Sequence, residues 1–141
     1  MITLDERLKA CAKYVSGKGT VCDVGTDHAY LPAYLILSEK CRNAVAGDIN
    51  DGPLEFAEQT LNKYKLSDKI KLVKSDGLKN ISPENVSDVI IAGMGGETIS
   101  DILAEAEWLR NGVNLILQPM TRAQGLRKWL YKNGYEIISE R

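Results

Sequence analysis

Hydrophobic residues recur along this chain with two different periods, which alternate from one segment to the next. Some segments have apolar residues at helical spacing, such as Leu4, Leu8 and Cys11, and others are short runs that are apolar at nearly every position. The pattern predicts helices around residues 3–16, 29–41, 51–64, 99–106 and 121–132. It predicts strands around residues 20–24, 43–49, 69–74, 87–92, 113–118 and 135–138.

The alternation of strands and helices indicates the fold class. Strands that are apolar on both faces, separated by helical segments, are typical of a parallel sheet covered by helices on both sides. The sequence therefore predicts an α/β fold with a doubly wound, mostly parallel sheet that occupies residues 1–141 as one domain. Thr3 and Glu6 have the spacing of a capping box, which would start an amphipathic first helix at about residues 3–16.

Composition places the chain among ordinary globular domains. It has 141 residues, a hydrophobic fraction of 44% and a charged fraction of 26%, which excludes a disordered or fibrous protein. No apolar run reaches the ~18 residues of a membrane span, and the N-terminus lacks the shape of a signal peptide, so the expected location is the cytoplasm. The net charge of −1 gives no electrostatic argument for nucleic acid.

The cysteine and histidine content argues against a metal site. Cys11, Cys22 and Cys41 are odd in number and lack C-x-x-C spacing, and His28 is the single histidine. Neither a disulfide framework nor a zinc site can be assembled from them. We expect three reduced, mostly buried thiols and no metal.

The turn after the first predicted strand favours a ligand without phosphates. In doubly wound sheets, ligands bind beyond the carboxyl ends of the strands, and Gly25 allows close approach of a ligand to the backbone there. The dinucleotide fingerprint G-x-G-x-x-G is absent, because Asp27 stands where its second glycine would be. A pyrophosphate would face the carboxylates of Asp23 and Asp27, so a positively charged ligand fits better.

Acidic residues end the first three predicted strands. Asp48 follows Gly25 by roughly the 20 residues that separate a glycine turn from a ribose-binding acid, and Asp76 ends the third strand. Each aspartate alone could be a turn residue or a helix N-cap. S-adenosylmethionine accounts for all three, with its amino group and sulfonium near Asp23, its ribose near Asp48 and its adenine near Asp76.

Two motifs carry a resemblance to a known family. They are Asp23-Val24-Gly25-Thr26-Asp27-His28-Ala29-Tyr30-Leu31-Pro32 and Ile91-Ala92-Gly93-Met94-Gly95-Gly96. Together they resemble the bacterial tRNA (adenine-22-N1)-methyltransferases, and residues 4–8, 47–50, 75–78 and 117–120 are also similar. The resemblance implies a Rossmann-like class I S-adenosylmethionine-dependent methyltransferase fold. It implies tRNA as the partner, bound with the help of a C-terminal helical part that this chain lacks.

The resemblance also implies roles for individual residues. The cofactor contacts that it implies are Gly25, Thr26, Asp27, His28, Asp48, Ile49, Asp76, Gly77, Ala92 and Gly93. Asp23 is expected to join them, and Arg7 is expected to bind the cofactor carboxylate. The substrate contacts expected around the target base are Met94, Gly95, Gly96 and Pro119. Arg7 could equally be a solvated charge of the first helix. A lone histidine at a helix start is more often a structural or cofactor contact than a general base. We therefore do not assign His28 as a catalytic base.

The chemistry expected at this site needs no base. N1 of neutral adenine carries a free lone pair, so orientation and desolvation suffice for methyl transfer. The N/D-P-P-Y/F motif typical of transfer to exocyclic adenine nitrogens is absent. Two alternatives remain open: a methyltransferase of small molecules or proteins, and a non-catalytic nucleotide-binding module.

Two further features concern what lies around the site. Arg122, Arg127, Lys128 and Lys132 form a basic cluster, which is either a solvated helix face or a contact for phosphates.

The chain stops within or just after the sixth predicted strand. We therefore expect a fold truncated after strand six, with its cofactor crevice whole.

Overall fold

A five-stranded parallel sheet forms the centre of the molecule. The computed structural model describes residues 2–141. The strands are β1 (Thr20–Val24), β2 (Ala44–Asp48), β3 (Ile70–Lys74), β4 (Val86–Gly95) and β5 (Asn114–Thr121). Their order in the sheet is β3-β2-β1-β4-β5, and every neighbouring pair is parallel. The predicted α/β fold class is confirmed.

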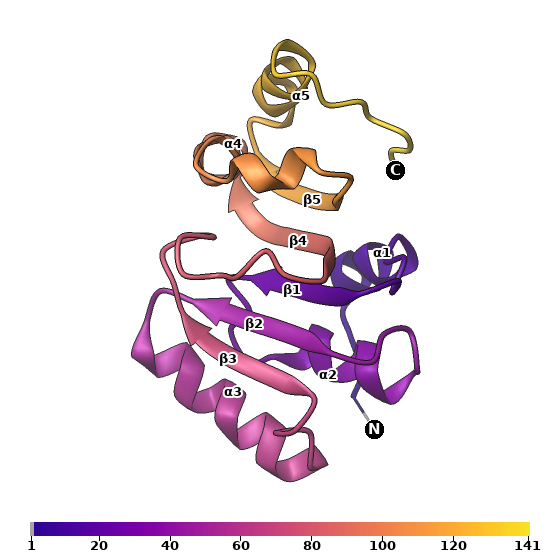
Figure 1. The fold of residues 1–141 in the computed structure, drawn as a ribbon, viewed down its shortest axis with the longest axis vertical. Coiled ribbons are helices and arrows are strands. Elements are labelled where there is room, and N and C mark those ends of the chain that lie inside the picture. Colours follow the sequence, from indigo (N-terminus) through magenta and orange to yellow (C-terminus); the bar gives the residue numbers. More distant parts are fainter. Residues whose placement is uncertain (1) are drawn as a thin grey trace.

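Helices cover both faces of this sheet (Figure 1). The helices are α1 (Glu6–Lys13), α2 (Tyr30–Leu37), α3 (Asp51–Tyr64), α4 (Gly96–Ala104) and α5 (Ala123–Lys132), with a short 3₁₀ helix at Glu107–Arg110. One apolar core contains residues of α1, α2 and α3, and the other contains residues of α4 and α5. None of the helices in residues 2–141 is long and apolar enough to cross a membrane.

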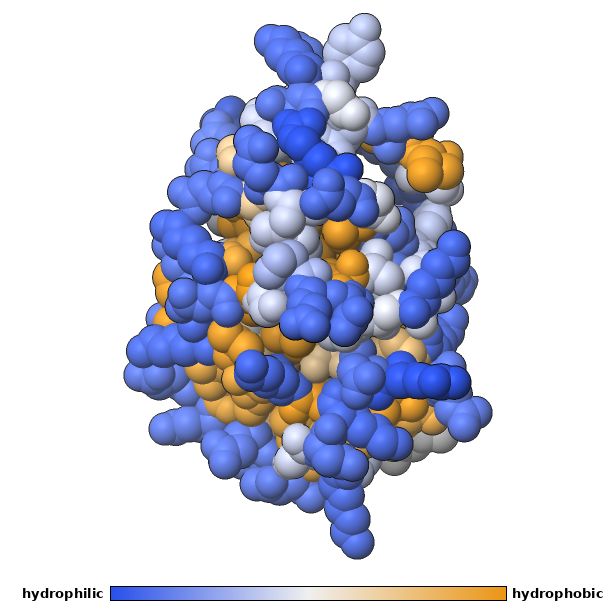
Figure 2. Space-filling model, viewed as in Figure 1, coloured by the Kyte–Doolittle hydropathy of each residue, from blue (hydrophilic) through white to orange (hydrophobic). Residues whose placement is uncertain are grey.

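The two cores arise from the alternation of side chains along each strand. In β4, Ile90 points into the core beneath α2 and α3, whereas Val89 and Ile91 point into the core beneath α4 and α5. All three are fully buried. The second core also includes Leu78 and Ile81 of the loop between β3 and β4, because no helix crosses the sheet there. Figure 2 shows apolar surface between the polar side chains on this face of the molecule.

The strand predicted at residues 135–138 is wrong. These residues form no ladder with β5, and Ile138 is 88% exposed. The ring of Tyr135 instead stacks on Trp129 at a centroid distance of 6.0 Å. A β-prone segment becomes a strand only when another strand supplies hydrogen-bond partners, and none does so here.

Several predicted boundaries also shift. The N-cap of α1 is Asp5, whose side chain accepts a hydrogen bond from the backbone N–H of Leu8 at 2.8 Å, so the capping box expected from Thr3 is wrong. Helix α2 is shorter than expected, because Glu39 adopts a positive φ just after it ends. Strand β4 runs on through Gly95, with shifts of register against β5 between Ala92 and Gly95.

A buried carboxylate holds the amino ends of the strands, opposite the carboxyl ends where the predicted site lies. Asp88 of β4 is fully buried and accepts hydrogen bonds from Ser16, Gly17, Ser87 and Asn114. Burial alone would raise the pKa of Asp88, but these hydrogen bonds outweigh it and hold the pKa below its ordinary value. The carboxylate therefore joins the turn after α1 to strands β4 and β5.

Candidate functional site

The loop after β1 is shaped by two backbone contacts with β2. The N–H groups of Gly25 and Thr26 both donate to the carbonyl oxygen of Gly47, each at 2.9 Å. Gly25 has φ of +73°, a conformation that side chains disfavour, and a Cβ there would lie 2.6 Å from the Met94 side chain. The predicted glycine turn is therefore present, and the Met94 side chain lies against it where β1 ends.

Asp23 lies beneath this loop as a buried carboxyl group. Thr26 Oγ1 donates a hydrogen bond to it at 2.8 Å. Burial raises the pKa of Asp23 to about 7; the nearby charge of Asp48 adds to this, while the Thr26 hydrogen bond and Arg7 oppose it. Asp23 therefore changes charge near neutral pH, and a cation bound close to it would favour its ionised form.

Asp48 is placed at the end of β2 by two hydrogen bonds. Its carboxylate accepts from the backbone N–H groups of Asp27 and Asn50, each at 3.2 Å. The side chain is nearly buried but borders the open space between β1 and β3. Asp48 thus ties the loop after β1 to the loop after β2 and presents its carboxylate to that space.

A cavity of about 400 Å³ opens at the carboxyl ends of β1 to β4. This size is within the range of small-molecule sites. The wall residues come from four strand ends and α4 and are Val24, Gly25, Asp48, Ile49, Ser75, Asp76, Gly77, Lys79, Met94, Thr98, Asp101, Ile102 and Glu105. Lys79 forms ion pairs with Asp76 at 3.1 Å and Glu105 at 3.5 Å. Carboxylates outnumber cations on the wall, so the cavity suits an uncharged or cationic ligand.

The cavity brings together only part of the predicted set. Its wall contains Gly25, Asp48, Ile49, Asp76, Gly77 and Met94. The predicted residues that do not line it are Arg7, Asp23, Thr26, Asp27, His28, Ala92, Gly93, Gly95, Gly96 and Pro119. Asp23 and Thr26 lie directly beneath the Gly25 turn, whereas Arg7 and Gly93 belong to a second cluster at the ends of β4 and β5.

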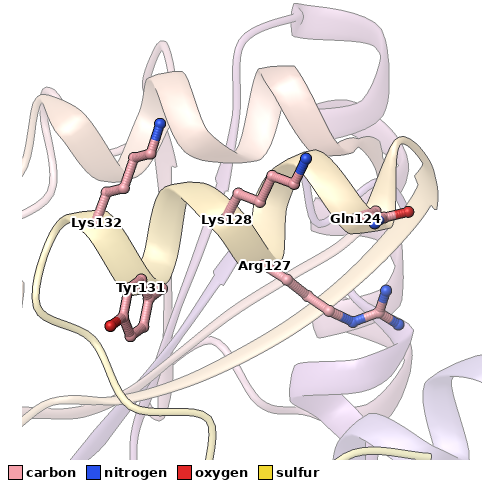
Figure 3. Close-up of a pocket in the computed structure, with 5 residues that line it drawn as sticks. All are labelled: Gln124, Arg127, Lys128, Tyr131 and Lys132. Atoms are coloured by element: carbon pink, nitrogen blue, oxygen red, sulfur yellow. The ribbon is translucent and has the colours of Figure 1, made fainter.

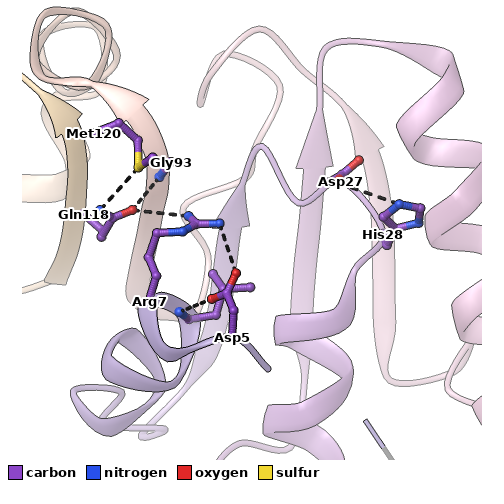
Figure 4. A network of polar contacts seen from close by, with 8 residues as sticks. Asp5, Arg7, Asp27, His28, Gly93, Gln118 and Met120 are labelled. Carbon is purple, nitrogen blue, oxygen red and sulfur yellow. Dashed lines mark hydrogen bonds and ion pairs between the residues drawn. The ribbon is translucent and has the colours of Figure 1, made fainter. Parts of the chain in front are cut away.

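The second cluster is organised by Gln118, which sequence reasoning did not assign to the site (Figure 4). The side-chain carbonyl oxygen of Gln118 accepts from the Arg7 guanidinium at 3.2 Å and from the Gly93 backbone N–H at 3.0 Å. Gly93 has φ of +82°, and a Cβ there would lie 2.8 Å from Arg7. The only sequence signal for Gln118 was its place at a strand end, within the motif at residues 117–120.

His28 lies apart from that cluster (Figure 4). Its ring stacks on Tyr30 at a centroid distance of 5.0 Å and packs against Phe56 at 4.8 Å. Its Nε2 is 3.9 Å from an Asp27 carboxylate oxygen. The histidine is therefore part of a half-exposed aromatic cluster between the start of α2 and the second turn of α3, and these contacts do not point to a general base.

Gly95 and Gly96 have a packing reason to be glycine. A Cβ on Gly96 would lie 2.4 Å from the Arg122 carbonyl oxygen, and a Cβ on Gly95 would lie 3.0 Å from Thr121 Oγ1. The start of α4 thus contacts the connection between β5 and α5. Their expected contact with a substrate stays a prediction.

The thiols do not contribute to this site. Cys11, Cys22 and Cys41 are buried and unpaired with one another, as expected from the sequence. Burial raises the pKa of Cys11 and of Cys41 to about 11, so both are protonated at neutral pH. They are therefore packing residues.

Known proteins are similar to this chain over nearly its whole length. A tRNA (adenine(22)-N(1))-methyltransferase of Bacillus subtilis is 40% identical over 140 residues, which is 99% of this chain and 59% of the relative. The crystal structure of the B. subtilis m1A22 tRNA methyltransferase TrmK superposes with a TM-score of 0.93 at 38% identity, covering 99% of this chain and 60% of the other. The predicted resemblance is confirmed.

A structure from Streptococcus pneumoniae in complex with S-adenosyl-L-methionine is equally similar. It has a TM-score of 0.93 and 38% identity, and the match covers 99% of this chain and 66% of the other. The chain therefore spans about 60% of the length of the relatives that it matches. The sequence model of the methyltransferase domain matches residues 4–141. Because this match covers nearly the whole chain, the chain belongs to the methyltransferase domain family.

Proposed function

We propose that this chain is the cofactor-binding and catalytic domain of an S-adenosylmethionine-dependent methyltransferase that modifies N1 of adenosine 22 in tRNA. The observation that carries the proposal is the acidic cavity of about 400 Å³ at the carboxyl ends of β1 to β4. The 40% identity to the B. subtilis tRNA (adenine(22)-N(1))-methyltransferase supports the choice of substrate. Residues 1–141 are taken as one such domain, and the tRNA-binding helical part is taken to lie outside them.

The residues present fit S-adenosylmethionine. Gly25 borders the cavity with its backbone alone, and no phosphate has to approach Asp48 or Asp76. In this proposal Asp23 faces the amino group, Asp48 accepts from the ribose hydroxyls and the Asp76–Gly77 turn borders the adenine. The Arg7 guanidinium binds the carboxylate, since its planar donors match that group. The remaining predicted contacts belong to the same proposal.

Methyl transfer at this site requires positioning more than proton chemistry. When bound, S-adenosylmethionine supplies a methyl group on a positively charged sulfur. Attack by the N1 lone pair forms the N–C bond and breaks the C–S bond, whose electron pair stays on sulfur, and no proton leaves the base. The residues around the cavity therefore act by holding the reacting atoms in line and excluding water.

The target base has to leave its stack before it can react. N1 lies on the Watson–Crick edge, so the enzyme acts on an unpaired or extruded adenosine. Met94 borders the cavity at the end of β4, where its flexible side chain can pack against a flat ring. We assign Met94, Gly95, Gly96 and Pro119 to the entry of the base.

The proposal is tested by transfer of labelled methyl groups to unmodified tRNA. We expect incorporation at position 22 that disappears when this adenosine is replaced by guanosine. Equal incorporation into the substituted tRNA would contradict the assignment of the position. Incorporation into protein or small molecules but not tRNA would favour the alternative methyltransferase, and binding of S-adenosylmethionine without any transfer would favour a non-catalytic module.

Partner and location follow from the same proposal. tRNA is the proposed macromolecular partner, and the cytoplasm is the proposed location, because tRNA modification is the activity of the B. subtilis relative by name. Fractionation of cells that express a tagged chain checks the location. Recovery of the chain with the membrane fraction would contradict it.

A further inference from the structure

The outer face of α5 is basic in a molecule that is otherwise acidic. The sequence of α5 contains Arg127, Lys128 and Lys132 and no acidic residue. The whole chain has a net charge of −1, so the rest of the chain carries an excess of negative charge. Like charges at positions i and i+4, as in Lys128 and Lys132, destabilise a helix by roughly 0.2–0.5 kcal/mol. Lys132 lies in the last turn of α5, where a cation interacts favourably with the helix dipole, whereas Lys128 lies before that turn.

These cations surround a shallow hollow of about 340 Å³ (Figure 3). Its wall consists of Gln124, Arg127, Lys128, Tyr131 and Lys132, and we call it the α5 patch. In Figure 3, Lys128 and Lys132 extend in one direction from the helix, and Tyr131 extends from the opposite side. Within residues 2–141, Arg127 is paired with Glu140 at 2.6 Å, whereas Lys128 and Lys132 form no ion pair.

Two features of the patch suit a nucleic acid. The Tyr131 ring is 84% exposed, so one of its faces is available for stacking on a base or a ribose. Gly125 precedes Lys128 by three residues and lies on the same face, and a Cβ built there meets nothing within 4 Å. A sugar–phosphate backbone can therefore approach the main chain of the helix beside the two ammonium groups.

The position of the patch relates it to the cavity. Helix α5 begins at the connection that contacts Gly96, the first residue of α4, and α4 and its C-cap contribute Asp101 and Glu105 to the cavity wall. At a rise of about 1.5 Å per residue, the patch extends roughly 14 Å away from that point. The acidic wall of the cavity repels phosphates, so an RNA that presents a base there needs a positive surface nearby.

We propose that the α5 patch binds the phosphate backbone of the tRNA substrate, with Lys128 and Lys132 as phosphate contacts and Tyr131 as a stacking surface. This inference rests on the proposed function, which supplies the identity of the RNA. It places a tRNA-binding surface within this chain, in addition to the helical part that the family resemblance implies.

The test compares charge reversal on the patch with the same charge change elsewhere. The patch variant is Lys128→Glu with Lys132→Glu, and the control is Lys63→Glu with Lys69→Glu, two exposed lysines in α3 and just before β3. Binding of this chain to labelled tRNA is measured by fluorescence anisotropy over a range of KCl concentrations. Calorimetry with S-adenosylmethionine and a thermal melt check that each variant is folded.

We expect the patch variant to raise the Kd for tRNA at least tenfold more than the control does. Replacing both lysines by alanine lowers the slope of log K against log[KCl] by about two, because each phosphate contact contributes about one. Tyr131→Ala weakens binding several-fold with little change of slope, and Tyr131→Phe restores it. The Kd for S-adenosylmethionine stays unchanged in all of them.

The outcomes separate this inference from the proposed function. If the wild-type chain methylates adenosine 22 and the patch variants bind and methylate tRNA as the control does, the patch assignment is wrong and the function stands. If the patch variants lose tRNA binding but no tRNA is methylated by the wild type, the patch stands and the function is wrong. Patch-dependent binding of polyglutamate instead of tRNA, or no tRNA binding by the wild type, overturns the patch.

Discussion

Asp23 is a carboxyl group whose burial makes its charge depend on pH near neutrality. Burial raises its pKa to about 7 in the folded chain, whereas an aspartate in an unfolded chain has a pKa near 4. Between these values the folded state keeps a proton that the unfolded state has released. The free energy of unfolding therefore falls as the pH rises from about 4 to about 7. Outside that window this carboxyl group adds little pH dependence to the stability.

Asp23→Asn is expected to remove this pH dependence. Three units of pKa correspond to about 4 kcal/mol, so the variant should gain stability over the wild type at pH 8 and resemble it at pH 4. Urea unfolding between pH 4 and 8 measures the difference, with the exposed Asp68→Asn as the control. Parallel profiles for the wild type and Asp23→Asn would contradict the buried titration.

Asp48 is the residue whose side chain most directly links the loops to the cavity. Asp48→Ala is expected to weaken binding of S-adenosylmethionine by roughly tenfold or more, because a hydrogen bond to a charged group contributes about 1.5–3 kcal/mol. Calorimetric titration gives the Kd. An unchanged Kd would overturn the assignment of this carboxylate to the ribose.

Gln118 is the residue that joins α1 to the ends of β4 and β5. Gln118→Leu removes the acceptor for both Arg7 and Gly93, so we expect the Kd for S-adenosylmethionine to rise about tenfold as the guanidinium loses its position. Gln118→Glu keeps an oxygen at the same place and should bind nearly as the wild type does. If both variants bind the cofactor equally well, Gln118 does not act through Arg7.

At the scale of elements, the molecule is held together by contacts between segments that are distant in sequence. Asp88 of β4 accepts from Ser16, which is 72 residues away, and from Asn114 of β5. These bonds fasten the amino ends of two strands to the turn after α1. The site lies at the opposite, carboxyl ends of the strands, so the two ends of the sheet have different roles.

Asp88→Ala is therefore expected to lower stability without changing the site. Several buried donors would lose their acceptor, which costs roughly 3 kcal/mol or more. Because the folded pKa of Asp88 is depressed, its contribution is present above the unfolded pKa and is lost as the pH falls through the folded value. Urea unfolding at pH 7 measures the loss, and a Kd for S-adenosylmethionine that also changed greatly would contradict the separation of the two ends.

At the scale of the whole molecule, the cavity joins the ends of four strands to the helical layer that contains α4. Its wall takes residues from the ends of β1 to β4 and from α4, so a ligand there contacts segments that are distant in sequence. Such a ligand binds only the folded chain, and its binding adds to the free energy of unfolding. The acidic wall favours a cation over a pyrophosphate in the same place.

Thermal melts should therefore distinguish two nucleotide ligands. At a concentration of 100 times its Kd, S-adenosylmethionine should stabilise the chain by about 2.7 kcal/mol and raise the Tm by several degrees. NAD at the same concentration should leave the Tm unchanged, because its pyrophosphate would face carboxylates. A larger shift with NAD would contradict the proposed ligand class.

The sequence by itself determined the α/β alternation, the parallel sheet and the glycine turn with its acids at strand ends. These features depend on local periods and turn residues, which can be read along the chain. Only the tertiary structure decided that residues 135–138 form no strand, that Gly95 lies within β4, and that Gln118 meets Arg7 across 111 positions. Strand pairing and long-range hydrogen bonds depend on which segments become neighbours, and no local pattern specifies that.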